Sequence, residues 1–114
     1  MQLIKVQNTL ANKLLEYEKD VNYYNYCDNY NDDKEAYDDI LNTLRSSKGI
    51  DCILFSIQED IDNFDGFYKN QPNNIYVKDM LNKSRNLFNE VKKYQKDMID
   101  MEKEYWRWVK WIKK

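Results

Sequence analysis

The chain has 114 residues, of which 33% are charged and 42% hydrophobic, and its formal net charge is −2. This composition favours one folded domain over residues 1–114 rather than a disordered chain. The sequence has no histidine, which excludes Ser-His-Asp and Cys-His catalytic arrangements, and two cysteines are too few for a zinc site. We therefore expect a protein that is not an enzyme and that holds no cofactor and no metal ion.

Two further features of the composition concern compartment and origin. No apolar run is long enough to span a membrane, and the first 20 residues lack the apolar core of a signal peptide. We expect a cytoplasmic protein in which Cys27 and Cys52 stay reduced. Phe, Tyr, Met, Ile, Asn and Lys make up 56 residues, whereas Gly, Ala, Arg and Pro make up eight. That bias is typical of AT-rich genomes, such as those of low-GC bacteria, their phages and their plasmids.

The charges are unevenly distributed along the chain. Residues 16–65 hold 14 acidic and 4 basic residues, whereas residues 78–114 hold 11 basic and 6 acidic residues. Either the two halves pack together and neutralise each other, or an acidic face is offered to a basic partner.

The first predicted helix covers residues 2–27. Its apolar stripe recurs at helical spacing and consists of Leu3, Leu10, Leu14, Tyr17, Val21 and Tyr24. A second helix is expected to begin at Asp32, because Glu35 three positions later completes a capping-box pattern. The segment 46–49 is expected to end this helix, with Gly49 as a left-handed C-cap.

A third helix is expected to begin with Asp51 as its cap. Its stripe steps by four and three through Ile50, Leu54, Ile57, Ile61, Phe64 and Tyr68. The short run 50–55 also fits a strand, but the continuing helical period favours a helix. The segment 70–74, which contains the only proline, is the strongest predicted loop.

The fourth predicted helix, 74–114, carries a heptad seam. The seam positions alternate in steps of four and three and are Met80, Ser84, Leu87, Val91, Tyr94, Met98, Met101, Tyr105, Trp108 and Ile112. The predicted fold is therefore all-α: an antiparallel helical bundle of about four helices with a long C-terminal helix. The second and third helices together, about 54 Å long, are expected to line most of that helix. A seam of this length can exceed what one chain covers, which also predicts a homodimer through residues 80–112.

The acidic run 59–66 raises the question of a calcium site. A calcium loop needs glycine at its sixth position and a bidentate glutamate at its twelfth. The position of Gly66 does not fit that spacing from Asp60. The run is therefore interpreted as a solvated helix face.

An unusual stretch combines four tyrosines with carboxylates. Tyrosine gives large contact area and keeps a polar tip, which suits interfaces. Within this stretch we expect a partner-binding surface formed by Tyr23, Tyr26, Asp28, Tyr30, Asp32 and Asp33. The alternative is a wet connection between helices whose tyrosines cover one end of the bundle.

The last ten residues, YWRWVKWIKK, place three tryptophans among basic residues. Trp108 continues the seam, and lysines near a helix C-terminus complement its dipole. Core packing does not explain Trp106 and Trp111 together, because they flank the seam on opposite sides. At least one of them is expected to contact another surface.

These features predict a non-enzymatic interaction module that binds a protein with a basic surface. Its size and composition suggest an inhibitor from a phage or mobile element that blocks a host defence protein. A nucleic-acid-associated subunit that uses the basic C-terminal helix is the alternative, although an isoelectric point of about 5.2 argues against it. A structural coiled-coil assembly protein is the third hypothesis.

Overall fold

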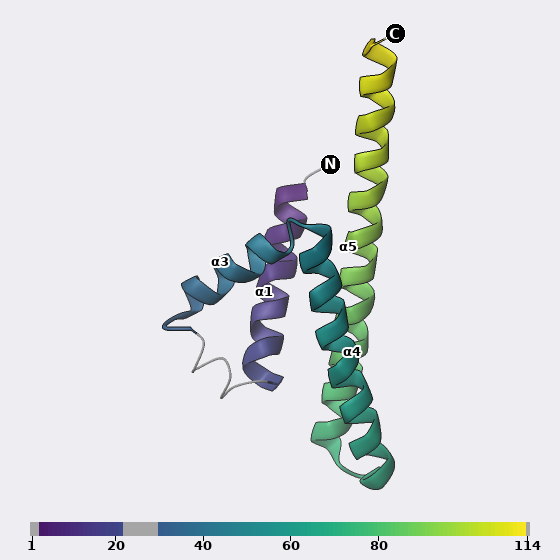
Figure 1. Ribbon diagram of the computed structural model, residues 1–114. Coiled ribbons are helices and arrows are strands. Elements are labelled where there is room, and N and C mark those ends of the chain that lie inside the picture. Colours follow the sequence, from purple (N-terminus) through teal and green to yellow (C-terminus); the bar gives the residue numbers. More distant parts are fainter. Residues whose placement is uncertain (1–2, 22–29, 114) are drawn as a thin grey trace.

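The computed structural model describes the backbone of residues 3–21 and 30–113, and the side chains of 4–21 and 30–110 (Figure 1). Within these residues the chain forms four helices and no strand, which confirms the predicted all-α bundle. The helices are α1 (Leu3–Val21), α3 (Asp33–Thr43), α4 (Ser47–Asn70) and α5 (Ile75–Lys113). The predicted end of the first helix, at residues 22–27, lies outside the described residues.

Helices α4 and α5 form an antiparallel hairpin (Figure 1). The turn between them falls at residues 71–74, as the sequence predicted. Asn74 caps α5, because its side-chain oxygen accepts a hydrogen bond from the backbone N–H of Val77 at 3.2 Å. The cap and the proline in the preceding turn fix the point at which the chain reverses.

The start of α3 follows the prediction. Asp32 is the N-cap, and its carboxylate accepts a hydrogen bond from the backbone N–H of Glu35 at 2.8 Å. The Glu35 carboxylate in turn accepts one from the backbone N–H of Asn31 at 3.2 Å. The pair is a variant of the capping box, because the return bond comes from Asn31, one residue before the N-cap.

The junction between α3 and α4 differs from the prediction. Gly49 is not a C-cap: it lies in the first turn of α4, and no described glycine has a positive φ. Asp51 is not the cap of this helix, because Ser46 accepts a hydrogen bond from the N–H of Gly49 at 3.0 Å. A Cβ at Gly49 would collide with the carbonyl oxygen of Thr43. Glycine here therefore permits a close approach of two backbones rather than a left-handed turn.

Apolar side chains from all four helices form one core. The stripes predicted on the first, third and fourth helices supply most of it. The buried members are Leu10, Ala11, Leu14, Leu15, Tyr17, Ala36, Ile40, Leu44, Ile50, Leu54, Ile57, Met80, Leu87, Val91 and Tyr94. Ser84, the one polar seam position, is also buried, and it hydrogen-bonds to Tyr17 and to the carbonyl oxygen of Met80.

Helix α1 runs antiparallel to α5 along its middle. Gln7 Nε2 donates a hydrogen bond to the Tyr94 hydroxyl at 2.9 Å, and Lys13 pairs with Glu90 at 3.0 Å. The Tyr94 hydroxyl also donates to the carbonyl oxygen of Leu44 at 2.7 Å. Leu44 follows the last residue of α3, so this carbonyl is one of those that a helix end leaves without an internal partner. One buried hydroxyl thus joins α1, the α3–α4 junction and α5.

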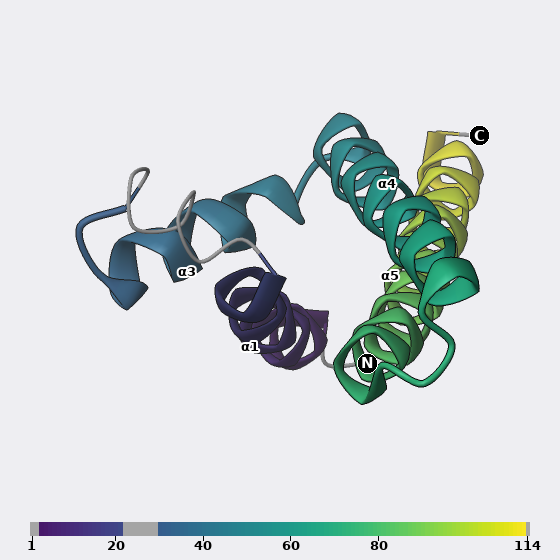
Figure 2. The same ribbon diagram turned by 90° about the horizontal axis from the view of Figure 1, so that it is seen from below.

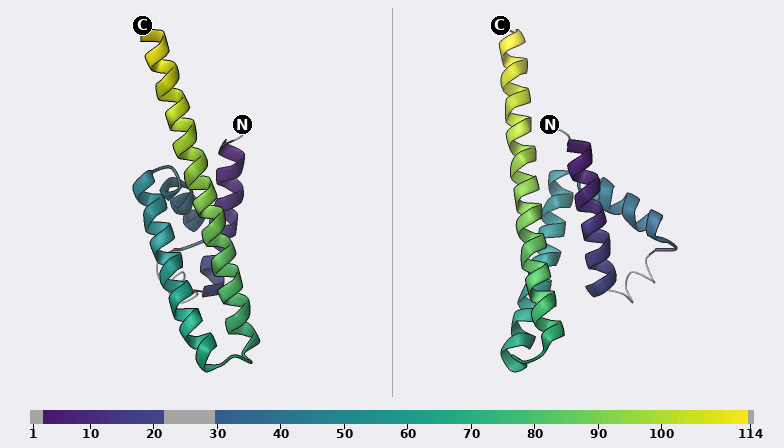
Figure 3. Two further views of the ribbon diagram at one scale, coloured as in Figure 1. Left: turned by 90° about the vertical axis from the view of Figure 1, so that its right-hand side faces the viewer. Right: turned by 180° about the vertical axis from the view of Figure 1, so that it is seen from behind.

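Helix α3 does not line α5, contrary to the prediction. It packs on α1 and meets α4 only near their junction, so it points away from the α4–α5 pair (Figure 2). The 24 residues of α4 span about 36 Å, whereas the 39 residues of α5 span about 58 Å. The C-terminal part of α5 therefore projects beyond the rest of the bundle (Figure 3).

Candidate functional site

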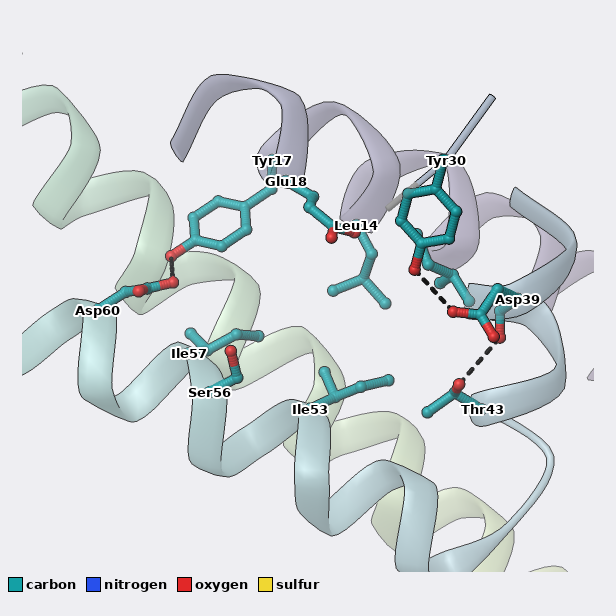
Figure 4. A pocket seen from close by; sticks show the side chains of 11 residues that line it. Leu14, Tyr17, Glu18, Tyr30, Asp39, Thr43, Ile53, Ser56, Ile57 and Asp60 are labelled. Carbon is teal, nitrogen blue, oxygen red and sulfur yellow. Dashed lines mark hydrogen bonds between the residues drawn. The ribbon is translucent and has the colours of Figure 1, made fainter. Parts of the chain in front are cut away.

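Helices α1, α3 and α4 enclose a groove of about 200 Å³ (Figure 4). Its carboxylates are Glu18, Asp39 and Asp60, and its other polar lining residues are Tyr17, Tyr30, Thr43 and Ser56. Figure 4 shows the Tyr17–Asp60 pair at one end and the Tyr30–Asp39 pair at the other. Between the pairs, the apolar side chains of α1 and α4 form the floor. We call this site the acidic groove.

At the first end of the acidic groove, the side chain of Tyr17 on α1 reaches residues of both α4 and α5. The Tyr17 hydroxyl donates a hydrogen bond to Asp60 at 2.7 Å and lies 2.9 Å from Ser84 Oγ. Burial raises the pKa of Tyr17 well above its ordinary value, so the hydroxyl keeps its proton. Burial also raises the pKa of Asp60, although the hydrogen bond from Tyr17 opposes that effect.

The second end depends on α3. The Tyr30 hydroxyl donates a hydrogen bond to Asp39 at 2.7 Å. Burial, this hydrogen bond and the nearby charges of Glu18, Asp39 and Glu35 all raise the pKa of Tyr30. Thr43 donates to the backbone carbonyl of Asp39 at 2.9 Å, which secures the last turn of the helix that carries the carboxylate.

Glu18 lies between the two ends. Burial raises its pKa, and the negative charge of Asp39 adds to that effect. Among the described residues, neither Glu18 nor Asp39 nor Asp60 forms an ion pair. The acidic groove therefore brings together two partly buried carboxylates, Glu18 and Asp60, and the exposed carboxylate of Asp39, and none of them forms an ion pair with a cation of the described chain.

The charge asymmetry of the sequence is only partly resolved within the molecule. Lys83 of α5 pairs with Asp20 at 3.6 Å, and Arg85 pairs with Asp65 at 3.6 Å. Lys19 pairs with Asp33 at 2.9 Å within the acidic half itself. The groove lies on the side of α1 and α4 that α3 covers, and none of these bases pairs with Glu18, Asp39 or Asp60.

The structure distributes the predicted binding residues over several places. Tyr30 lines the acidic groove, whereas Asp32 caps α3 and Asp33 pairs with Lys19. The remaining members of the Tyr-rich stretch, Tyr23, Tyr26 and Asp28, lie outside the described residues.

Sequence reasoning missed Glu18, Asp39 and Asp60 as site residues. Tyr17 was assigned to the core stripe, and Asp60 to a solvated helix face. Asp60 does lie between Ile57 and Ile61 of the stripe, at the edge of the buried face. That border position is the only local signal, because the groove depends on the angle at which α3 crosses α1.

The aromatic end of α5 forms a second surface. Trp106 is 54% exposed, and its ring packs edge-to-face on Tyr105 with centroids 5.7 Å apart. Trp106 also borders a shallow hollow with Lys103, Arg107 and Lys110. The side chain of Trp111 lies outside the described residues.

Two general properties complete the description of the sites. No helix of the described chain is both long enough and apolar enough to cross a membrane. Across the described residues, no three His, Cys, Asp or Glu side chains lie close enough together to hold a metal ion.

Comparisons of the chain with protein families, with curated proteins and with solved structures give no match.

Proposed function

We propose that the protein is a non-enzymatic interaction module that binds a partner protein with a basic surface. In this proposal a lysine or arginine side chain of the partner enters the acidic groove. The observation that carries the proposal is the groove itself: three carboxylates and two tyrosines line one cavity without a cation of the described chain.

The chemistry of the acidic groove favours a cationic side chain. Desolvation already raises the pKa of Glu18 and of Asp60, so a cation that enters offsets an unfavourable burial of negative charge. The tyrosines add aromatic surface, which attracts lysine and arginine. The volume of about 200 Å³ is below the range of pockets for drug-sized ligands and suits one side chain.

The groups in the acidic groove support binding rather than catalysis. The pKa values of Tyr17 and Tyr30 are raised, so neither hydroxyl acts as a base or nucleophile near neutral pH. Histidine, the commonest general base, is absent from the sequence. A role as a phage or mobile-element inhibitor rests on size and composition and remains a prediction from the sequence.

Partner capture with matched baits tests this proposal. The groove bait carries Glu18→Gln, Asp39→Asn and Asp60→Asn. The control bait carries Asp38→Asn, Glu59→Gln and Asp62→Asn, three exposed acids of α3 and α4 outside the groove, and so has the same net charge.

Both baits and the natural chain are incubated with lysate of a low-GC bacterium, treated with nuclease, and read by mass spectrometry. We expect one stoichiometric protein with the natural chain and the control bait, and at least a tenfold loss with the groove bait. Equal capture by all three baits would contradict the role of the groove. If the captured material is nucleic acid alone before nuclease treatment and nothing remains after it, the nucleic-acid hypothesis would be favoured instead.

A further inference from the structure

The seam of α5 continues past the bundle without cover. Met80 to Tyr94 are buried at seam positions, but Met101 is 36% exposed, Tyr105 58% and Trp108 59%. The spacing of four and three does not change at this point. We call residues 99–113 the α5 arm. Its described side chains, up to residue 110, continue the heptad pattern of the buried part of the helix, and no described element packs on them.

This uncovered face is larger than core formation requires. Ile99 and Trp106 are also about half exposed and extend the apolar surface beyond the seam. Contiguous apolar surface of this kind on a small protein marks an interaction site. A heptad face is matched by another helix, because knobs on one helix fit the holes of the other.

The distribution of charge along the arm indicates which partner helix fits its apolar face. Residues 97–104 carry four acids and one base, whereas residues 107–114 carry four bases and no acid. We infer that the arm pairs with the arm of a second copy of this chain in antiparallel orientation. Each acidic half then faces a basic half, whereas a parallel pair would set like charges side by side.

The shape of the bundle supports the same orientation. The seam face of α5 is occupied by α4 and α1 of the same chain up to Met98. A parallel partner helix on the arm would run straight into these helices. An antiparallel partner ends there instead, and its own bundle lies beyond the tip of the arm (Figure 3).

The base of the arm offers further contact for the end of a second copy. Gln7 bonds to Tyr94, so the first turns of α1 lie beside this part of α5. Ile4 and Val6 are exposed there. The C-terminal end of an antiparallel partner reaches this level and covers both side chains.

The contact area predicts a weak dimer. Three half-exposed aromatic rings per arm, each with on the order of 100 Å² left to bury, give roughly 600 Å² in a pair. The aliphatic side chains raise this to about 1,000 Å², at the lower limit of specific interfaces. We expect a dissociation constant in the micromolar range that rises with ionic strength.

Sedimentation equilibrium of the full chain over a wide concentration range tests the pairing. We expect a monomer–dimer equilibrium that Met101→Ala with Trp108→Ala weakens at least tenfold. The control is Phe55→Ala with Phe67→Ala, which removes two exposed rings of α4 outside the arm and should leave the equilibrium unchanged. A monomer at all concentrations, or equal effects of both double variants, would overturn the inference.

Orientation is read from distances between spin labels. Labels at Lys96→Cys or at Lys103→Cys, each with Cys27→Ser and Cys52→Ser, lie on the outer face of α5. In an antiparallel pair the axial offset between the two Lys96 labels exceeds that between the two Lys103 labels by about 21 Å, from 14 residues at 1.5 Å each. Equal distances at both sites would mean a parallel pair and would contradict the inference. Single-stranded DNA bound by a monomer would assign the arm to nucleic acid.

Discussion

Replacing Tyr94 with phenylalanine removes one hydroxyl that joins three parts of the bundle. Tyr94 is 2% exposed, and its hydroxyl accepts from Gln7 and donates to the Leu44 carbonyl. Both partners are buried, so water does not replace the lost hydrogen bonds. Each unsatisfied buried group costs about 1–3 kcal/mol, so the two together predict a loss of about 2–6 kcal/mol in the free energy of unfolding.

Urea and thermal denaturation followed by circular dichroism measure this loss. For a chain of this size it corresponds to a fall in Tm on the order of 10 °C. Tyr105→Phe is the matched control, because the exposed hydroxyl of Tyr105 should contribute less than about 0.5 kcal/mol. Gln7→Leu combined with Tyr94→Phe should destabilise the fold by less than the sum of the two changes, since no Gln7 amide is then left unpaired. A Tyr94→Phe variant as stable as Tyr105→Phe would refute the proposed junction of α1, α3 and α5.

Three other substitutions test the packing and the acidic groove. Gly49→Ala should lower the free energy of unfolding by about 1–3 kcal/mol, because the added Cβ meets the Thr43 carbonyl. Gly66→Ala, whose Cβ meets nothing within 4 Å, should raise it by about 0.5–1 kcal/mol. Denaturant titration measures both changes, and equal effects would contradict the close approach at Gly49. Val91→Ala should cost about 2 kcal/mol and Met101→Ala almost nothing in dilute solution, since only Val91 is buried, so a comparable loss at Met101 would show that the arm packs on its own bundle. Burial raises the pKa of both Glu18 and Asp60, so their contribution to stability is present below the unfolded pKa of about 4 and is lost as pH rises through the folded pKa. Glu18→Gln with Asp60→Asn should therefore stabilise the fold at neutral pH and lose that advantage below about pH 4; urea denaturation at both pH values that gives the same difference would argue against the burial of these carboxyls.

Local sequence signals predicted most of the helices. The four-and-three spacing, the loop at 70–74 and the N-cap at Asp32 each depend on neighbouring residues, and each is confirmed. The junction at Gly49 was mispredicted because two local signals compete there. Ser46 is a strong N-cap, and glycine is favoured both at a C-cap and wherever backbones approach closely.

The acidic groove could not be predicted in the same way. Its two ends depend on contacts between distant parts of the chain, such as Tyr17 with Asp60, and on the direction in which α3 leaves its junction. From the sequence alone, a carboxylate at the border of a helix stripe is expected to face solvent, because the position of the neighbouring helix is not known. The heptad seam of α5 could be predicted from the sequence. The point along α5 at which other helices stop covering the seam could not, because it depends on α3 packing against α1 instead of α5.

An NMR titration with N-acetylarginine methylamide tests whether the acidic groove receives a cationic side chain. We expect saturable shifts in the carboxyl signals of Glu18, Asp39 and Asp60, with an affinity of about millimolar, as expected for one side chain. The pKa of Glu18 and of Asp60 should fall in the complex, because a nearby positive charge favours the ionised carboxyl. N-acetylglutamine methylamide, which is similar in shape but uncharged, should cause no saturable shift. Identical responses to the two probes, or shifts confined to acids outside the groove such as Asp62, would mean that the groove does not bind a cationic side chain.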